Sequence, residues 1–139
     1  MSRYLLDTNV VSEMRKGKRA NPGVLAWLAS VEDADLYLSV LVVGEIRRGV
    51  EQARSSTPAK ARALEVWLGG LEQHYGERVL PITTEIATEW GRLSALCPLS
   101  PVDGLVAATA LVHDLTLVTR NVNDMVLSGV QLLNPFSNR

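Results

Sequence analysis

The sequence predicts an α/β domain built on a mostly parallel sheet of about five strands. Short apolar runs, typical of buried strands, alternate along the chain with longer segments of helical apolar periodicity. Several helical segments begin with a polar residue followed by proline, which suits a helix N-terminus. The chain has 139 residues, 47% hydrophobic and 21% charged, which is enough to form a single domain over residues 1–139.

Each predicted strand is short and ends at a polar residue, a proline or a turn. The first ends at Asp7 and the second at Ser39, while Pro81 limits the third because proline cannot donate a ladder hydrogen bond. The five predicted strands are residues 4–6, 36–38, 79–80, 116–118 and 130–133. Binding sites in such sheets form beyond the carboxyl ends of the strands, so polar residues at those ends are the first candidates for function.

The segments between the strands are predicted to be helices. One begins after Asp7, and a second, opened by Pro22, carries Trp27 and Leu28. The others cover residues 40–53, residues 58 to about 74, residues following Thr84 through 96, and residues 101 to about 114. The last of these is apolar on almost every side, so it is predicted to be buried between layers.

Composition excludes several classes of protein. A formal net charge of −1 excludes a nucleic-acid binder that relies on bulk positive charge, and 5% aromatic residues disfavour a base-stacking platform. A single cysteine, Cys97, excludes an internal disulfide and a cysteine-based zinc site. The carboxylate at Asp7 interrupts any signal peptide, and no apolar run of membrane-spanning length occurs. The protein is therefore expected to be cytoplasmic, with no membrane partner.

Asp7 is the first carboxylate in an unexpected place. It directly follows an apolar strand and precedes Thr8, Asn9 and the apolar pair Val10 and Val11. This position is at the carboxyl edge of the sheet and at the start of a helix. The alternative role is simple helix capping by Asp7 or Thr8.

Glu45 follows the second strand, on the helix of residues 40–53. Helical spacing places Val43, Ile46, Val50 and Ala53 on one apolar stripe and Glu45 on nearly the opposite side. The carboxylate is therefore not required to be buried. The alternative is a solvated glutamate beside Arg48 at the three-residue spacing.

Asp103 is the one acid in the first turns of the buried helix. Ser100 and Asp103 have the spacing of a capping box, which is the alternative explanation for this acid. The small residues Ala107 and Ala110 leave room beside the carboxylate for an ion or permit close helix packing. A fourth polar segment, residues 119–124, follows the fourth strand, where an ordinary turn is the alternative.

The four segments together indicate more than each does alone. Three follow a predicted strand and the fourth opens a buried helix, so one fold can bring their carboxylates together. Clustered carboxylates repel each other unless a cation lies between them. Oxygen ligands, with histidine only at positions 74 and 113, favour Mg²⁺ or Mn²⁺ over zinc.

These motifs, in this order, resemble PIN-domain ribonucleases, and in particular VapC-type toxins of type II toxin–antitoxin systems. The matching segments are Leu-Leu-Asp7-Thr8-Asn9, Val-Gly-Glu45-Ile-Arg-Arg-Gly49, Pro-Val-Asp103-Gly-Leu-Val-Ala-Ala-Thr-Ala and Leu-Val-Thr119-Arg120-Asn121-Val122-Asn123-Asp124. The ending Leu-Leu-Asn-Pro-Phe is similar to the subgroup that includes gonococcal trafficking toxins. The resemblance covers essentially the whole chain.

The resemblance implies a three-layer α/β/α domain and an endoribonuclease that depends on Mg²⁺, for which Mn²⁺ can substitute. It assigns Asp7 and Asp103 as metal ligands and Glu45 as the third catalytic acid. The fourth acidic position, an aspartate in many relatives, is either replaced by Asn121 or supplied by Asp124. Thr8, Asn9, Thr119 and Asn121 match polar positions that support the acids through hydrogen bonds.

The resemblance also implies partners: an RNA substrate, a cognate antitoxin protein and a second copy of the chain in a homodimer. Candidate docking surfaces for the antitoxin are the Trp27 helix and the helix of residues 40–53, unless those faces belong to the core. Ten of the fourteen Lys and Arg residues lie in residues 1–64. Among them, Arg47 and Arg48 are predicted to bind RNA at a basic rim around the acids, with a merely solvated face as the alternative.

Two other functions compete with the nuclease. Because Asn121 departs from the family pattern, a catalytically weak or inactive PIN-fold module that binds RNA or protein is the first alternative. A phosphotransfer or phosphatase domain with Asp7 as nucleophile ranks last, because it expects an acid two residues on and position 9 is asparagine.

Overall fold

The computed structural model describes residues 2–138, so residues 1 and 139 of the predicted domain lie outside the described residues. Five parallel strands form one sheet in the order β3-β2-β1-β4-β5. The strands are β1 (Tyr4–Leu6), β2 (Leu36–Ser39), β3 (Val79–Leu80), β4 (Thr116–Val118) and β5 (Leu132–Leu133). The predicted parallel α/β sheet of five strands is confirmed.

The fifth strand is shorter than predicted. Residues 130–133 were expected to pair, but only Leu132 and Leu133 do, opposite Leu117 and Val118 of β4. Val130 follows the turn at Gly129, whose φ of 79° is left-handed, and its side chain is buried in the core rather than paired in the ladder. The sequence alone does not distinguish an apolar residue that pairs in the sheet from one that is buried in the core beside it.

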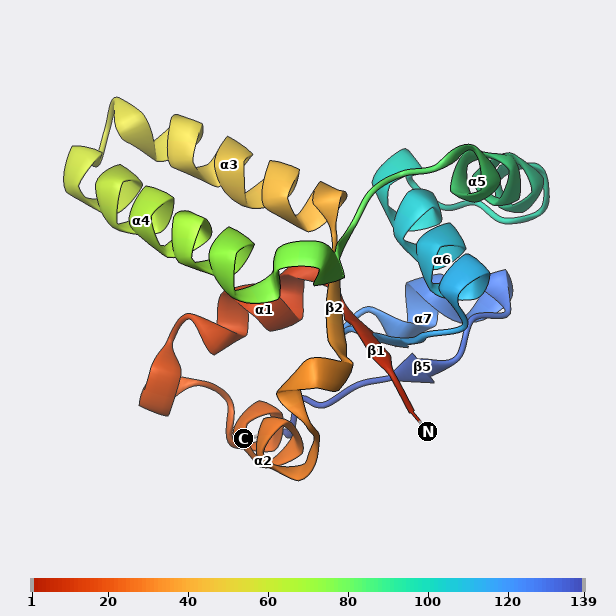
Figure 1. Cartoon of the computed structure of the whole chain (residues 1–139), viewed down its shortest axis with the longest axis horizontal. Coiled ribbons are helices and arrows are strands. Elements are labelled where there is room, and N and C mark those ends of the chain that lie inside the picture. Colours follow the sequence, from red (N-terminus) through yellow and green to blue (C-terminus); the bar gives the residue numbers. More distant parts are fainter. Residues whose placement is uncertain (1, 139) are drawn as a thin grey trace.

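The helices lie on both faces of the sheet, as Figure 1 shows. They are α1 (Thr8–Met14), α2 (Pro22–Ser30), α3 (Val40–Arg54), α4 (Pro58–Tyr75), α5 (Thr84–Leu96), α6 (Pro101–His113) and α7 (Val122–Met125). No helix within residues 2–138 combines the length and apolar character that crossing a membrane requires.

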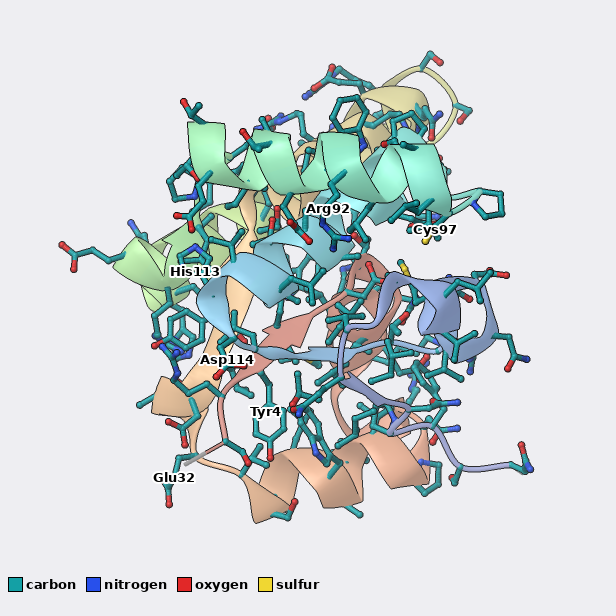
Figure 2. The ribbon with its side chains drawn as sticks, turned by 90° about the vertical axis from the view of Figure 1, so that its right-hand side faces the viewer. Tyr4, Glu32, Arg92, Cys97, His113 and Asp114 are labelled. Carbon is teal, nitrogen blue, oxygen red and sulfur yellow. The ribbon has the colours of Figure 1, made fainter. Side chains whose placement is uncertain are left out.

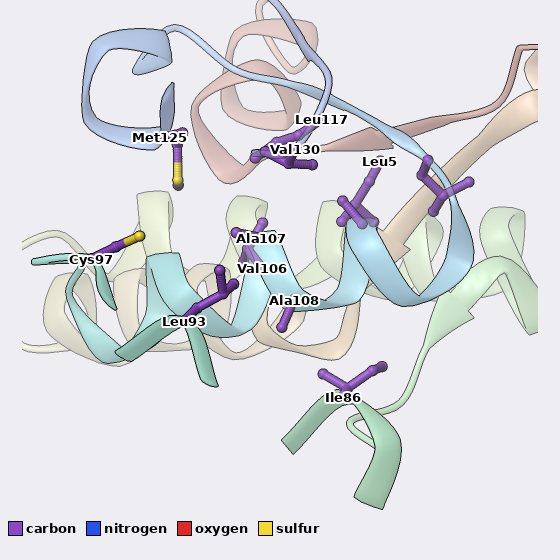
Figure 3. Packing of buried hydrophobic residues seen from close by; sticks show 12 residues of the cluster. Leu5, Ile86, Leu93, Cys97, Val106, Ala107, Ala108, Leu117, Met125 and Val130 are labelled. Carbon is purple, nitrogen blue, oxygen red and sulfur yellow. The ribbon is translucent and has the colours of Figure 1, made fainter. Parts of the chain in front are cut away.

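Two hydrophobic cores flank the sheet because neighbouring side chains of a strand point to opposite faces. Leu5 and Leu117 pack with the side chains of α5, α6 and α7, the cluster drawn in Figure 3. Leu6 and Val118, their neighbours in the same strands, pack with α1, α2, α3 and α4 on the other face. The result is the three-layer α/β/α arrangement that the resemblance implied.

The carboxyl edge of the sheet is where the strands lead directly into helices. Asp7 caps α1 immediately after β1, and Ser39 caps α3 immediately after β2 through its hydroxyl, which accepts from the Leu41 amide. Thr119 follows β4, the strand that pairs with β1 on its other side. Because parallel strands end at the same edge, these residues are brought to one place.

The buried stripe of α3 differs from the predicted one. Its buried residues are Val42, Ile46 and Val50, whereas Val43 and Ala53 are half-buried. Val42 and Ile46 pack in the core with Leu38 of β2 and Leu68 of α4, so the side of α3 that faces the core differs from the predicted one. Glu45 remains outside the buried stripe and is half-buried.

Candidate active site

Asp7 is the centre of a hydrogen-bond network at the carboxyl edge. Its side chain is 6% exposed. One carboxylate oxygen, Oδ1, accepts from the Thr8 amide at 2.9 Å. The other, Oδ2, accepts from the Thr119 hydroxyl at 2.8 Å and the Asn9 side-chain amide at 3.3 Å. Three donors from two chain segments therefore fix the orientation of this carboxylate.

Asn9 and Thr119 also bind each other and the loop after β4. The Asn9 Nδ2 donates to Thr119 Oγ1 at 3.2 Å, and Asn9 Oδ1 accepts from the Arg120 amide at 3.0 Å. The fully buried Thr119 hydroxyl accepts from the Asn121 amide at 3.0 Å. Asn121 contributes through its backbone, and its side chain is exposed. The sequence motifs assigned Arg120 no role, although its position directly after Thr119 was the available signal.

Glu45 is joined to this network through Thr8. The Thr8 hydroxyl donates to Glu45 Oε1 at 2.5 Å. The alternative predicted for Glu45, an ion pair with Arg48, is absent among residues 2–138, whereas Thr8 links it to the residue beside Asp7. Thr8 thus holds Asp7 with its amide and Glu45 with its hydroxyl.

The pKa of Asp7 lies above its ordinary value of 3.8. Burial is the largest cause, because desolvation disfavours the charged form, and the nearby carboxylates of Asp103 and Glu45 raise the pKa further by repulsion. The hydrogen bonds from Thr119 and Thr8 act in the opposite direction. Asp103 and Glu45 are therefore close enough to Asp7 to repel its charged form.

Asp103 lies in the first turn of α6 and is half-buried. Ser100 caps the helix, since its hydroxyl accepts from the Asp103 amide at 3.2 Å. The reciprocal half of a capping box is missing, because the Asp103 carboxylate makes no hydrogen bond within residues 2–138. The cap therefore uses the backbone of Asp103 and leaves its carboxylate free.

Asp103 shares a pocket of about 270 Å³ with Asp124. The other lining residues are Cys97, Pro98, Leu99, Ser100, Asn123 and Leu127. Figure 2 labels Cys97 at the end of α5, close to the segment that contains α7, and its thiol contacts the Leu127 carbonyl at 3.2 Å. Asn121 does not line this pocket, whereas Asn123 and Asp124 do, so Asp124 is the acid of the fourth segment that shares the pocket with Asp103.

The donor set suits a hard divalent cation. Asp7, Glu45 and Asp103 offer carboxylate oxygens, and the Asp103 carboxylate has no competing protein partner within the described residues. No group of three histidine, cysteine or acidic side chains within residues 2–138 forms a ready-made metal cage. Mg²⁺ does not need one, because it usually keeps several waters and binds one or two carboxylates together with substrate phosphates. The residues therefore fit Mg²⁺.

The two arginines predicted to form the basic rim, Arg47 and Arg48, differ in their ion pairs. Arg47 donates to Glu65 at 2.6 Å and to Glu51 at 3.3 Å, and Arg54 contacts the same two glutamates. These contacts join α3 to α4. Arg48 is exposed and has no ion pair among residues 2–138, so its charge is available to a ligand, whereas that of Arg47 is compensated.

Comparisons with known proteins agree with this architecture. The family model described as PIN domain matches residues 4–124. Toxin FitB of Neisseria gonorrhoeae is 32% identical, over 95% of this chain and 97% of that protein. VapC ribonuclease Y4jK of Sinorhizobium fredii is 31% identical, over 95% and 96%. The crystal structure of FitAcB from Neisseria gonorrhoeae has a TM-score of 0.85 at 33% identity, covering 95% of this chain and 97% of that one. The chain belongs to the PIN-domain family.

Proposed function

We propose that this protein is a Mg²⁺-dependent endoribonuclease and the toxin of a type II toxin–antitoxin pair. The observation that carries the proposal is the buried, triply hydrogen-bonded carboxylate of Asp7, with Glu45 and Asp103 close enough to raise its pKa. The relatives named as a toxin and as a VapC ribonuclease match over nearly their full length, which supports the same activity here.

In this proposal, the residues of the site have different roles in phosphodiester hydrolysis. When bound, Mg²⁺ supplies positive charge that polarises the scissile phosphate and lowers the pKa of a water. Asp7 and Asp103 hold the ion, with Mn²⁺ as a substitute. Glu45, held by Thr8, orients the attacking water and accepts its proton. Water attacks phosphorus as the P–O3′ bond breaks, and the departing 3′-oxygen takes a proton from solvent, which leaves a 5′-phosphate and a 3′-hydroxyl.

Asp124, rather than Asn121, fills the fourth acidic position in this proposal. Asp124 lines the pocket that contains Asp103. Asn121 presents its amide to Thr119 and its side chain to solvent. Asp124 therefore adds negative charge on the Asp103 side of the site, where it assists catalysis.

An antitoxin is proposed to dock in a groove of about 270 Å³ between α1, α3 and α4. Beside Glu45 it is lined by the apolar side chains of Ile46, Leu64 and Trp67 and the basic ones of Arg15 and Lys60, together with Thr8, Ser12 and Gly49. Such a surface fits an acidic segment with apolar anchors. The other candidate surface, on α2, is less suitable because Trp27 packs edge to face on Tyr4 in the core, with ring centroids 5.1 Å apart.

A homodimer is proposed to form through the apolar side chains next to the Asp103 pocket. Leu96, Val126 and Leu127 are 69%, 62% and 70% exposed. Leu96 and Leu127 belong to neighbouring segments, because the thiol of Cys97 contacts the carbonyl of Leu127. Large exposed apolar side chains gathered in one region are typical of association surfaces.

The direct test is to sequence the ends that the purified protein produces on total RNA, with Mg²⁺ and with EDTA. Specific new ends with a 5′-phosphate are expected for the wild type in Mg²⁺, and none for Asp7→Asn. RNA binding without cleavage in Mg²⁺ would support the alternative of a non-catalytic module. Equal cleavage by Asp7→Asn preparations, cleared of contaminating nuclease, contradicts the proposal.

Arg48→Gln is expected to weaken RNA binding more than Arg47→Gln. Arg48 keeps an unpaired charge, whereas Arg47 is neutralised by Glu51 and Glu65. Removing the cation that neutralises one phosphate lowers the slope of log affinity against log salt by about 0.7 for single-stranded RNA. Fluorescence anisotropy across a salt series in EDTA measures both quantities, and equal effects of the two variants would contradict the expectation.

Thr119→Val is expected to lower activity about 10–100-fold, because a residue that orients a metal ligand typically has an effect of this size. The variant removes the hydroxyl that donates to Asp7 and accepts from Asn121. An unsatisfied buried partner also lowers the free energy of unfolding by about 1–3 kcal/mol. Cleavage rates across a Mg²⁺ titration and denaturant melts measure the two effects.

Thr109→Val is the matched control for this prediction. Thr109 is equally buried, and its hydroxyl donates to the Leu105 carbonyl within α6. It is expected to alter stability without changing the Mg²⁺ dependence. If Thr119→Val changed stability alone, Thr119 would have only a structural role.

A further inference from the structure

A second polar pocket, of about 320 Å³, lies between α1, the loop after β4 and the C-terminal segment. Its lining carries three cations, Lys16, Arg19 and Arg120, and a single acid, Glu13. The other lining residues are Asn21, Ser137 and Asn138, so none of the side chains within residues 2–138 that line the pocket is apolar. This composition favours a small anionic group over an apolar ligand.

Glu13 is satisfied by the protein itself. Its Oε1 accepts from the Lys16 ammonium at 3.0 Å and its Oε2 from the Asn21 amide at 2.8 Å. The hydrogen bond from Lys16 is the main reason that the pKa of Glu13 lies below its ordinary value, and Arg120 contributes to the same shift. The carboxylate thus anchors Lys16, and the pocket keeps a net positive charge.

Arg120 is also held in place. Its guanidinium lies over the Phe136 ring, with the Cζ atom 3.9 Å from the ring centroid. Stacking of this kind leaves the N–H edges of the guanidinium free for hydrogen bonds. Neither Arg120 nor Arg19 forms an ion pair with another residue of the described chain.

Asn21, which lines the pocket, joins two segments that are distant in sequence. Its Oδ1 accepts from the amides of Gly23 and Ser137, each at 2.9 Å, and its Nδ2 donates to the Ser137 carbonyl at 2.9 Å. The segments approach so closely that a Cβ on Gly23 would lie 2.4 Å from the Pro135 carbonyl oxygen. Asn21 and Ser137 therefore hold fixed positions in the lining of the pocket.

The pocket is coupled to the acidic site through Arg120. The Arg120 amide donates to Asn9 Oδ1, and Asn9 donates to Asp7 Oδ2. The preceding residue, Thr119, contacts Asp7 directly. Arg120, which lines the pocket, is therefore the next residue in the chain after one that contacts the Asp7 carboxylate.

We infer that this pocket binds a backbone phosphate of the RNA strand next to the one that is cleaved, through Arg120, Arg19 and Lys16. The inference rests on the proposed function, since it identifies how that substrate is held. A planar guanidinium with free N–H edges matches phosphate geometry. A protein partner is disfavoured because its segment would find no apolar anchor here.

The test compares binding of a short fluorescein-labelled single-stranded RNA by the full chain in EDTA. The double variant Arg19→Gln/Arg120→Gln is expected to bind at least about tenfold more weakly, because hydrogen bonds to charged groups are strong. Its salt slope is expected to fall by about 0.7 for each phosphate that the variant no longer neutralises. In Mg²⁺, the KM for RNA is expected to rise more than kcat falls.

Two further variants keep the test specific. Arg54→Gln/Arg92→Gln removes the same charge from residues paired with Glu51, Glu65 and Glu89, and it is expected to bind like the wild type. Arg92, labelled in Figure 2, lies on α5 and is not among the described residues that line the pocket. Arg120→Lys keeps the charge but loses the planar fork, so it is expected to retain the salt slope with weaker affinity. Thermal melts check that each variant folds.

The outcomes separate the pocket from the proposed activity. If the wild type cleaves RNA but Arg19→Gln/Arg120→Gln binds like the Arg54→Gln/Arg92→Gln control, the pocket inference is wrong and the nuclease stands. If the wild type binds RNA through the pocket but does not cleave it in Mg²⁺, the nuclease proposal is wrong. A wild type that binds no RNA in EDTA contradicts the inference whatever its cleavage. Unchanged RNA binding with loss of antitoxin binding would assign the pocket to a carboxylate of the partner protein.

Discussion

Asp7→Asn is expected to lower RNA cleavage by at least about a hundredfold, since even groups that only support a metal ligand contribute 10–100-fold. The substitution keeps the size of the side chain but removes the charge that holds the cation. In the wild type the Thr119 hydroxyl and the Asn9 side-chain amide donate to Asp7 Oδ2. The amide oxygen of the introduced asparagine can accept the same two hydrogen bonds. Initial rates of cleavage in saturating Mg²⁺ measure the loss.

The same substitution is expected to change the free energy of unfolding in EDTA by no more than about 1 kcal/mol, because two effects oppose each other. Removing a buried charge stabilises the fold, whereas losing the acceptor for the Thr8 amide destabilises it. The cleavage defect is therefore not a folding defect. Added Mg²⁺ is expected to raise the Tm of the wild type but not that of Asp7→Asn, because only the former binds the ion.

The raised pKa of Asp7 determines how the difference in stability between the wild type and Asp7→Asn depends on pH. The folded pKa is raised above 3.8, so the folded state binds the proton more tightly than the unfolded state. The wild type is thus expected to lose stability, relative to Asp7→Asn, as pH rises from the ordinary pKa through the folded one. Denaturant melts of both proteins in EDTA across this range measure the trend, and a difference that grows in favour of the wild type would contradict it.

Asp103→Asn is expected to reduce cleavage as strongly, again by at least about a hundredfold. Its carboxylate makes no hydrogen bond within residues 2–138, and the Ser100 cap uses its backbone amide, so the fold needs only its backbone. Loss of a favourable charge at the start of α6 lowers the free energy of unfolding by about 0.3–1 kcal/mol. A large loss of activity with little loss of stability is the expected result.

Asp114→Asn is the matched control for both aspartates. Asp114 lies at the other end of α6, labelled in Figure 2, and is exposed in a left-handed conformation, φ 54°, that asparagine also adopts. It is expected to cleave like the wild type. A comparable loss in this variant would show that charge in general, rather than the acidic site, sets the rate.

The double variant Asp7→Asn/Asp103→Asn tests whether the two residues hold one ion. If they do, the second substitution is expected to add little to the first, because residues that act as a unit are strongly non-additive. Two independent hundredfold losses would instead assign the carboxylates to separate steps. Sequencing of residual cleavage ends distinguishes slow specific cleavage from background.

Much of the fold follows from local sequence. The alternation of short apolar strands with capped helices predicted the parallel sheet, and Pro22, Pro58 and Pro101 each begin a helix where expected. Polar residues at strand ends predicted that Asp7 and Thr119 lie at one edge. These signals are local because a strand end and a helix cap are determined by a few neighbouring residues.

Features that depend on how one element packs or pairs with another could not be predicted from the local sequence. The rotation of α3 that buries Val42 instead of Val43 depends on how the helix packs on its neighbours. The start of β5 depends on which residues pair with β4. In α3 the competing residues, Val42 and Val43, are of the same type, and before β5 the apolar Val130 is buried in the core without pairing in the sheet, so periodicity does not separate these positions.

The sequence by itself determined that Asp7 directly follows the first strand and so lies at the carboxyl edge of the sheet. Only the tertiary structure decided that Asp124 shares a pocket with Asp103, that Glu65 neutralises Arg47, and that Arg120 and Lys16 line one pocket. The reason is physical: caps and strand ends are short-range, whereas ion pairs and pockets join side chains far apart in the chain. Which cations stay free to meet an RNA phosphate is therefore a property of the folded surface.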